Sequence, residues 1–118
     1  MVLVVDQNKD VLAFYRNFYK NLGVNSAEFT DPEDAYNFFA KFHKSFRLIT
    51  TGLNLAHKYD GLWLARNIKK ISNRPIILIT GGLPPQGLEN DLFSSVLIKP
   101  MSLDDLTVLI SFWHSLKA

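Results

Sequence analysis

Short apolar runs recur along this chain, and each one ends at a polar residue or a turn. The first is VLVV at residues 2–5, and four more follow at residues 24–29, 48–51, 76–80 and 95–98. A short, continuous apolar run is typical of a strand that is covered on both faces in a parallel sheet. The run at 24–29, VNSAEF, is the weakest of the set. The pattern predicts five strands.

Stretches with helical periodicity separate the first three strands. The first predicted helix ends at Gly23 and places apolar residues three or four positions apart. Its stripe is Val11, Phe14, Tyr15, Phe18 and Leu22. The second helix begins with a capping residue, Thr30 or Asp31, ahead of Pro32 and Glu33. Its inward residues are Ala35, Phe38, Phe39 and Phe42.

Two more helices are predicted in the second half of the chain. The third spans about residues 60–71, with an inward stripe of Gly61, Leu64, Ala65, Ile68 and Ile71. The last opens with PMSLDDL, where Ser102 is the expected N-cap. Its sheet-facing stripe is Leu103, Leu106, Ile110 and Trp113, widened by Leu109, Phe112 and Leu116. Between the fourth and fifth strands, GGLPPQGLENDLFSS leaves room for a short or degenerate helix near Leu88 to Phe93.

This alternation of strands and helices indicates right-handed βαβ units, so the predicted fold class is α/β with a doubly wound five-stranded parallel sheet. In such sheets, ligands bind outside the carboxyl ends of the strands. The residues at those ends are Asp6, Gln7, Gly52, Thr80 and Lys99. Gly52 is unexpected, because it leaves the end of the third strand, a usual place for a reactive group, without a side chain.

Composition limits the classes of function. The length of 118 residues fits a single domain over 1–118, and the absence of cysteine excludes disulfides, thiolate catalysis and cysteine-bound zinc. The net charge of +2 is small, and we interpret it as evenly spread, so no nucleic-acid surface is expected. No apolar run approaches the ~20 residues of a membrane span, and the start has no signal-like leader. We therefore expect a cytoplasmic protein that binds no membrane.

Four segments, in order, resemble the receiver domain of two-component response regulators. VLVVDQNKDV is similar to the acidic first loop, and GLNLAHKYDGLWLARNI to the segment that carries the phosphoacceptor and the next helix start. PIILIT is similar to the switch-threonine strand, and LIKPMSLDDL to the Lys-Pro turn before the last helix. The resemblance implies a flavodoxin-like sheet of order 2-1-3-4-5. It also implies that an Asp ending strand three takes a phosphoryl group from a histidine kinase.

The resemblance assigns a role to each residue at the strand ends. Asp6 and Gln7 match the two metal-binding acids, Gly52 the phosphoacceptor, Thr80 the switch hydroxyl and Lys99 the phosphate-contacting lysine. Aspartyl phosphorylation needs a carboxylate nucleophile and a divalent metal, and Gly52 supplies neither a nucleophile nor a ligand. Gln7 offers only a neutral carbonyl. We predict an ion pair between Asp6 and Lys99 with a structural role, and we expect neither Mg²⁺ nor another cofactor.

Two further parts of the family's switch differ in this chain. Val96 stands where the family usually carries an aromatic residue whose rotation reports phosphorylation, three residues before Lys99. The segment from Thr80 to Lys99 is also a few residues shorter than in the family, at the expense of the fourth helix. We expect Thr80 to be buried and hydrogen-bonded to the backbone.

Other reactive groups have simpler interpretations. Asp60 is the candidate for a substitute phosphoacceptor in a domain that is still switchable, but we favour a role as N-cap of the third helix. His57 lacks ligand spacing to another histidine, so we expect it to be solvent-exposed. A flavodoxin-type cofactor domain needs a glycine-containing phosphate loop, which DQNKDV lacks. No P-loop, GxGxxG or Ser/His/Asp set is present, so an enzyme is not expected.

Two helices are candidates for a protein-interaction surface. Leu62 and Trp63 fall outside the inward stripe of the third helix, and Trp63 is either an interface anchor or the margin of the core. On the last helix, the wide stripe with Leu109 and Phe112 is either wrapped by the core or used by a dimer or a partner helix. The predicted function is a phosphorylation-independent interaction module in a signalling pathway, with a homodimer through the last helix as one option.

Overall fold

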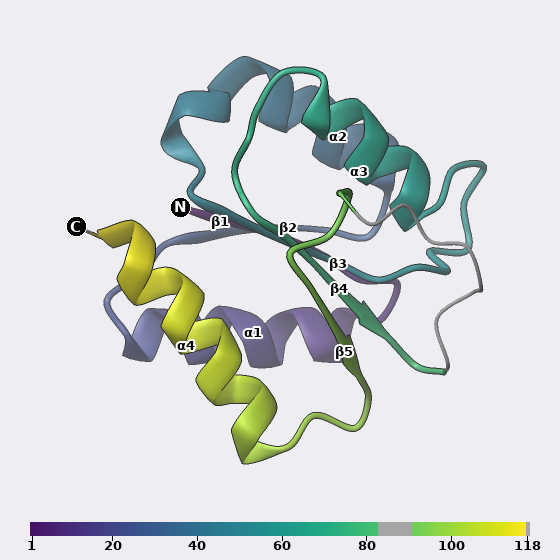
Figure 1. The fold of residues 1–118 in the computed structure, drawn as a ribbon. Coiled ribbons are helices and arrows are strands. Elements are labelled where there is room, and N and C mark those ends of the chain that lie inside the picture. Colours follow the sequence, from purple (N-terminus) through teal and green to yellow (C-terminus); the bar gives the residue numbers. More distant parts are fainter. Residues whose placement is uncertain (83–90, 118) are drawn as a thin grey trace.

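The computed structural model describes the backbone of residues 1–82 and 91–117, and the side chains of 1–82 and 91–112. Strands and helices alternate along this part of the chain (Figure 1). The strands are β1 Val2–Val5, β2 Ser26–Phe29, β3 Leu48–Thr51, β4 Ile76–Thr80 and β5 Ser95–Ile98. The helices are α1 Lys9–Asn21, α2 Pro32–Phe42, the short 3-10 helix η1 His43–Ser45, α3 Gly61–Lys69 and α4 Leu103–Lys117. The predicted bounds of four strands are confirmed, and β2 begins two residues later than predicted.

The five strands form one sheet in the order β2-β1-β3-β4-β5, and every neighbouring pair is parallel. Val2 is in register with Ser26 on one side and with Leu48 on the other, so β1 lies between β2 and β3. All residues of β1, β3 and β4 are buried, whereas β2 and β5 are only partly covered at the two edges. The α/β class and the order 2-1-3-4-5 are confirmed.

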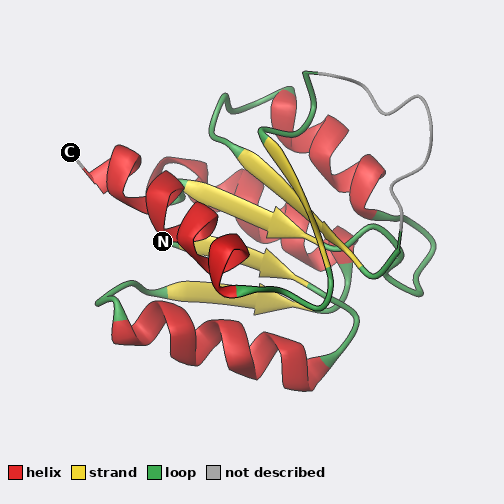
Figure 2. Ribbon diagram, turned by 60° about the horizontal axis from the view of Figure 1, so that its bottom comes forward, coloured by secondary structure: helices red, strands yellow, loops and turns green. Residues whose placement is uncertain are grey.

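Helices cover both faces of the sheet, as Figure 2 shows. The core under α1 and α4 includes Leu12, Tyr19 and Leu109, and the core under α2 and α3 includes Phe39 and Leu64. Burying apolar side chains on both faces stabilises the sheet by about 25 cal/mol for each Å² removed from water. This arrangement leaves the carboxyl ends of the strands as the place where polar groups can gather.

Side-chain caps fix the helix starts at that edge of the sheet. Asn8, Asp31 and Asp60 each accept a hydrogen bond from a backbone amide in the first turn of α1, α2 and α3. At α4, the Ser102 hydroxyl accepts from the amide of Asp105 at 3.1 Å, and the Asp105 carboxylate accepts from the amide of Ser102 at 2.9 Å. Each such cap contributes about 1 kcal/mol to helix stability. The predicted caps Asp31 and Ser102 are confirmed.

The predicted sheet-facing stripe of α4 is correct at Leu106 and wrong at Leu103, and the side chains of Trp113 and Leu116 lie outside the described residues. Leu109 is fully buried against the sheet, whereas Leu103, placed in the stripe, is 82% exposed. Leu106 and Phe112 pack beside Leu109 as partly buried residues. This helix carries apolar residues on more than one face, so periodicity alone did not fix its rotation.

No helix in the described part of the chain is long and apolar enough to cross a membrane.

Smaller rotational errors affect the other predicted stripes. On α1, Phe14 is 51% exposed, and Leu12 and Tyr19 take the buried positions beside Tyr15. Phe42, at the end of α2, is 46% exposed. The α3 stripe is confirmed from Gly61 to Ile68, but Ile71 lies beyond the helix and is 40% exposed. Residues at helix ends extend past the sheet edge, so a regular stripe overestimates their burial.

The connection between β4 and β5 carries no helix in its described residues, 81, 82 and 91–94. Of the short helix predicted near Leu88 to Phe93, residues 88–90 lie outside the described part of the chain, and residues 91–93 are not helical. Leu92 is buried and packs with the core under α2 and α3. Leu92 therefore attaches the chain to that core just before β5.

Candidate functional site

Side chains from four strands meet at the carboxyl edge of the sheet. Asp6 follows β1, Gly52 follows β3, Thr80 ends β4 and Lys99 follows β5. Because the strands are parallel, their carboxyl ends lie at one edge, and these residues line a pocket of about 220 Å³. The other lining residues are Gln7, Leu53, Asn54, Ile79, Gly81 and Gly82. The structure thus brings together all five residues that the sequence placed at the strand ends.

Asp6 and Lys99 form an ion pair at the centre of this pocket. The Lys99 ammonium donates to Asp6 Oδ2 at 2.6 Å, and the backbone amide of Asn8 donates to Asp6 Oδ1 at 2.9 Å. Asp6 is 4% exposed, so the lysine neutralises a buried charge that would be costly on its own. Both carboxylate oxygens are therefore occupied by donors from the chain itself. The predicted ion pair is present.

Gly52 forms part of the pocket wall without contributing a side chain. Its amide donates to the Val5 carbonyl at 2.9 Å, which fixes the backbone beside β1. A Cβ atom built here would lie 3.3 Å from Leu55 Cδ2, 3.8 Å from the Ile79 carbonyl oxygen and 3.9 Å from Asp6 Oδ2. The nearest neighbour is a terminal methyl group of the buried Leu55, which has to shift by a few tenths of an ångström to admit a larger residue at Gly52.

Gly61, in contrast, is required by the local packing. A Cβ atom at this position would lie 1.9 Å from the Gly52 carbonyl oxygen, and the Gly61 amide donates to the Leu53 carbonyl at 2.8 Å. The first turn of α3 therefore packs directly against the backbone of the loop that follows β3. Periodicity placed Gly61 only in an apolar stripe and did not predict this close approach. The Asp-Gly helix start was the pattern that could have indicated it.

The two remaining polar residues of the pocket differ in exposure. Thr80 is 5% exposed, and its hydroxyl accepts a long hydrogen bond of 3.4 Å from the amide of Gly82. The expectation of a buried, backbone-bonded Thr80 is confirmed. Gln7 is exposed at the rim. Among the described residues that line the pocket, Asp6 is the one carboxylate.

Comparison with known proteins identifies the fold and the arrangement of the strand ends. The family model described as the response regulator receiver domain matches residues 2–111. This chain belongs to that family. Receiver domains are signalling domains. A search of curated proteins found no match.

Solved structures of receiver domains agree in fold at low sequence identity. A two-component response regulator from Clostridium difficile superimposes with a TM-score of 0.82 at 22% identity, covering 99% of this chain and 98% of that chain. A receiver domain protein from Clostridium thermocellum gives 0.78 at 20% identity, covering 98% and 93%. The response regulator protein TrrA from Thermotoga maritima, in complex with Mg²⁺-BeF, gives 0.79 at 21% identity, covering 93% and 95%. These likenesses establish the receiver fold.

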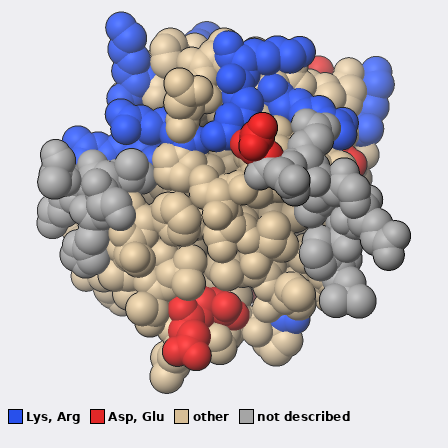
Figure 3. Space-filling model, in the orientation of Figure 1, with Lys and Arg blue, Asp and Glu red and all other residues tan. Residues whose placement is uncertain are grey.

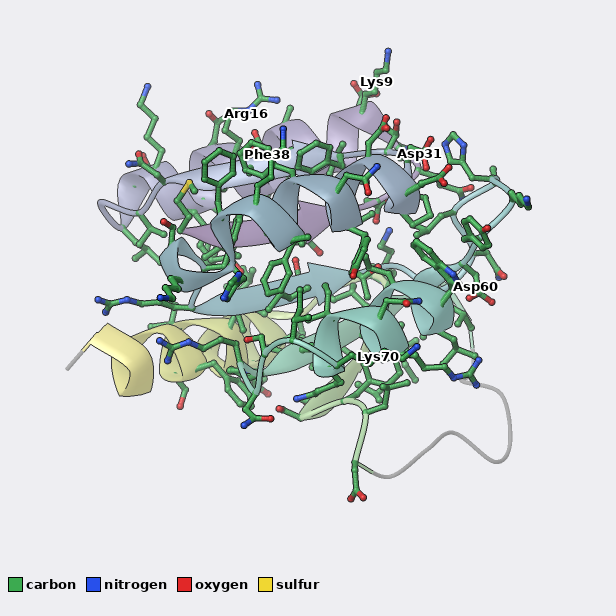
Figure 4. All side chains as sticks on the ribbon, turned by 90° about the horizontal axis from the view of Figure 1, so that it is seen from above. Lys9, Arg16, Asp31, Phe38, Asp60 and Lys70 are labelled. Carbon is green, nitrogen blue, oxygen red and sulfur yellow. The ribbon has the colours of Figure 1, made fainter. Side chains whose placement is uncertain are left out.

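Asp60 and His57 lie outside the pocket of this receiver domain. Asp60 caps α3 by accepting from the Trp63 amide at 2.9 Å, and it is exposed. His57 is also exposed, and its Nδ1 lies 3.9 Å from Asp31 Oδ2. Figure 4 shows Asp31 and Asp60 at the same side of the α2 and α3 layer. The expected capping role of Asp60 and the expected exposure of His57 are confirmed.

The candidate surface on α3 is partly covered by other aromatic residues. Trp63 stacks on Tyr59 with ring centroids 4.1 Å apart, and the edge of Tyr36 packs against it at 5.8 Å. Trp63 and Leu62 are both partly buried and pack against the core under α2 and α3. This geometry fits the interpretation of Trp63 as the margin of the core.

The candidate surface on α4 needs a correction. Leu109 is fully buried, so it is a core residue and cannot form an interface, and Phe112 is partly buried beside it. The exposed apolar side chains in this region are instead Leu103 on α4 and Val96 and Ile98 on β5. Val96, which stands at the predicted switch position, is 37% exposed.

Proposed function

We propose that this receiver domain works without phosphorylation, as a protein-interaction module in a signalling pathway, and that it is not an enzyme. In this proposal Gly52 stands where the family carries its phosphoacceptor. The observation that supports it is the state of Asp6: both of its oxygens accept hydrogen bonds from the chain, and Gly52 adds no carboxylate beside it. The pocket keeps its shape and lacks a nucleophile.

The residues of the pocket do not fit Mg²⁺. This ion requires near-octahedral oxygen coordination and is usually held by carboxylates. Here Asp6 Oδ2 lies 2.6 Å from the Lys99 ammonium, and Gln7 at the rim is neutral. A divalent cation would have to displace the Lys99 ammonium from Asp6, which is the one carboxylate among the described residues of the pocket. We therefore derive no step through a metal and expect no other cofactor.

Of the two side chains that transmit phosphorylation in the family, the threonine is kept as Thr80 and the aromatic residue is replaced by Val96. A switch of this kind needs a side chain with two distinct positions, and the short, β-branched Val96 has no ring to move between them. The Thr80 hydroxyl is already bonded, at 3.4 Å, to the amide of Gly82. Neither residue supports a change of surface that depends on a phosphoryl group. In the proposed function the interaction surface is therefore constant.

The surface we propose for a protein partner or a second copy is formed by β5 and α4. Val96 and Ile98 on β5 are 37% and 43% exposed, and Leu103 on α4 is 82% exposed. Figure 3 shows basic residues above this region and acidic residues below it, and Asp104 and Asp105 follow Leu103 directly in the first turn of α4. Exposed apolar residues with polar and charged neighbours at the rim are typical of protein interfaces. We propose a protein partner here, with no nucleic acid and no membrane.

Intact-mass spectrometry after incubation with acetyl phosphate and Mg²⁺ tests this function. The proposal predicts no covalent adduct on the wild-type chain. A stoichiometric gain of about 80 Da, the mass of one phosphoryl group, would instead favour a switchable receiver with a substitute acceptor. Loss of that gain in an Asp60→Asn variant would then identify Asp60 as the substitute.

A further inference from the structure

The charges of this chain are strongly segregated, and the interpretation of an even spread was wrong. Residues 35–88 contain eight Lys or Arg and a single acidic residue, Asp60, whereas the rest of the chain contains five Lys or Arg and ten Asp or Glu. The net charge does not reveal this difference, because the positive charge of residues 35–88 and the negative charge of the rest of the chain nearly cancel. Figure 3 shows the result, with Lys and Arg gathered across the top of the view, over the layer that holds α2 and α3.

Most of the basic residues lie at one end of the sheet, which we call the basic end. Its members are Lys41, Lys44, Arg47, Arg66, Lys69, Lys70 and Arg74. They lie in the last turns of α2 and α3 and in the segments that lead into β3 and β4. Backbone hydrogen bonds from Arg47 to Met1 and from Ile49 to Pro75 hold these segments together. In βαβ units the helices run back to the amino ends of the strands, so the basic end lies opposite the pocket.

Several cations of the basic end lack an acidic partner in the part of the chain that the structure describes. Lys41, Lys44, Lys70 and Arg74 form no ion pair within the described residues, and all four are exposed. The Lys69 ammonium donates to the Arg74 carbonyl at 3.2 Å, which is a capping contact rather than a charge pair. Cations in the last turn of a helix offset its dipole, and this accounts for Lys41 and Lys69. It does not account for Lys44 or Arg74, which lie outside the α-helices.

Exposed apolar side chains are interspersed among these cations. Phe42 is 46% exposed and lies between Lys41 and Lys44 in the sequence, and Ile71 is 40% exposed directly after Lys70. A nucleic-acid backbone offers phosphates and sugars, which would leave both side chains without an apolar contact. Each of them also keeps more than half of its surface covered, which is too little exposure for insertion into a membrane. A polypeptide with carboxylates and apolar side chains matches both components.

We propose that the basic end binds an acidic segment of a partner protein, one in which Asp or Glu residues alternate with apolar residues. The carboxylates contact the unpaired cations, and the apolar side chains cover Ile71 and Phe42. Opposite charge increases the rate of encounter and excludes basic partners. This inference rests on the proposed function as a protein-interaction module and adds a second surface, with a defined chemistry, on the other side of the molecule from the pocket.

Fluorescence anisotropy tests the proposal with a short fluorescein-labelled peptide in which Glu and Leu alternate. The comparison peptide carries Gln in place of Glu. The test variant is Lys44→Glu, Lys70→Glu. The matched control is Lys9→Glu, Lys58→Glu, which changes the net charge by the same amount at the pocket end, because Lys9 is in the first turn of α1 and Lys58 is in the loop between β3 and α3. Thermal melting checks that both variants are folded. Oligothymidylate and anionic phospholipid vesicles serve as the nucleic-acid and membrane probes.

The proposal predicts that the Glu peptide binds wild type and the control variant alike. The basic-end variant should bind it at least about tenfold more weakly, and the affinity should fall as salt approaches about 0.5 M. No binding of the Glu peptide, equal binding of the Gln peptide, equal loss in both variants, or tighter binding of oligothymidylate or vesicles would overturn it. None of these outcomes depends on the absence of phosphorylation, which the acetyl phosphate experiment measures separately.

Discussion

Asp6 and Lys99 lie 93 residues apart in the sequence and form the closest polar contact in the pocket, at 2.6 Å. Asp6 is almost completely buried, so removing the lysine leaves a charge without compensation. We predict that Lys99→Met lowers the free energy of unfolding by about 3 kcal/mol. Urea denaturation measures this. In the double variant Asp6→Asn, Lys99→Met the loss should be smaller than in Lys99→Met alone, and additive losses would contradict a coupled pair.

Gly61 provides a second prediction at the residue scale. In Gly61→Ala the new methyl group would lie 1.9 Å from the Gly52 carbonyl oxygen, so the start of α3 has to move away from the β3 loop. We expect a loss of about 3 kcal/mol or more in the free energy of unfolding. The matched control is Gly81→Ala, where a Cβ atom meets nothing within 4 Å. Similar stabilities of the two variants would show that the packing of Gly61 on Gly52 is not as close as described.

Tyr19 gives a prediction about alkaline pH. Burial raises the pKa of both Tyr15 and Tyr19, and the Tyr19 hydroxyl is buried without a hydrogen-bond partner among the described residues. Because the pKa is higher in the folded state, stability is complete below the unfolded value of about 10 and is lost as pH rises above it. Tyr19→Phe should therefore unfold at higher pH than wild type. At neutral pH it should be as stable or about 1 kcal/mol more stable.

Circular dichroism during a pH titration measures this transition. The comparison variant is Tyr15→Phe, which also removes a titrating group but loses the hydrogen bond from its hydroxyl to Met101 Sδ. It should show the same alkaline shift with a cost at neutral pH. An unchanged alkaline midpoint in Tyr19→Phe would mean that this hydroxyl reaches solvent.

At the scale of single elements, α4 allows the most direct test of which face packs on the sheet. Leu109 is fully buried, and Leu103 is 82% exposed on the same helix. We predict that Leu109→Ala lowers the free energy of unfolding by about 3 kcal/mol, as expected for a cavity in the core, and that Leu103→Ala changes it by less than about 0.5 kcal/mol. Chemical denaturation separates the two. A larger loss at Leu103 would favour the stripe predicted from periodicity.

The elements differ in how well the sequence predicted them. The central strands were predicted with correct bounds because burial on both faces produces a continuous apolar run, and the edge strand β2 was the weakest pattern because it is only partly covered. The helices were predicted, but one residue in each of the α1 and α4 stripes, Phe14 and Leu103, is exposed. Both helices carry apolar residues outside their buried stripe, such as Phe14 and Leu103. The helical spacing of apolar residues is therefore consistent with more than one rotation of each helix about its axis.

At the scale of the whole molecule, the sequence predicted which residues meet but not how they pack. Parallel strands bring their carboxyl ends to one edge, so the alternation of strands and helices predicts that the strand-end residues share that edge, and the resemblance to receiver domains predicted that Asp6 and Lys99 meet there. The close approach of Gly61 to Gly52 depends on the path of the β3–α3 loop, which no periodicity encodes. The basic end was not predicted for a different reason. The net charge sums over the whole chain, whereas the fold gathers the basic residues at the ends of α2 and α3.

The two ends of the molecule therefore have different properties. The pocket end contains a self-compensated pair, Asp6 and Lys99, and the opposite end carries cations without acidic partners within the described residues. In the proposed account, the family's scaffold is retained for its surfaces, and the pocket contributes stability. The inertness of the pocket is the central claim.

Restoring the acids tests that claim most directly. The variant Gln7→Asp, Gly52→Asp should fit the fold after a small shift of the Leu55 side chain, because the nearest atom to a Cβ at Gly52 is Leu55 Cδ2 at 3.3 Å. Wild type and variant are incubated side by side with acetyl phosphate and Mg²⁺, and their intact masses are measured. We predict a gain of about 80 Da for the variant and none for wild type. The same gain on the wild-type chain would contradict an inert pocket.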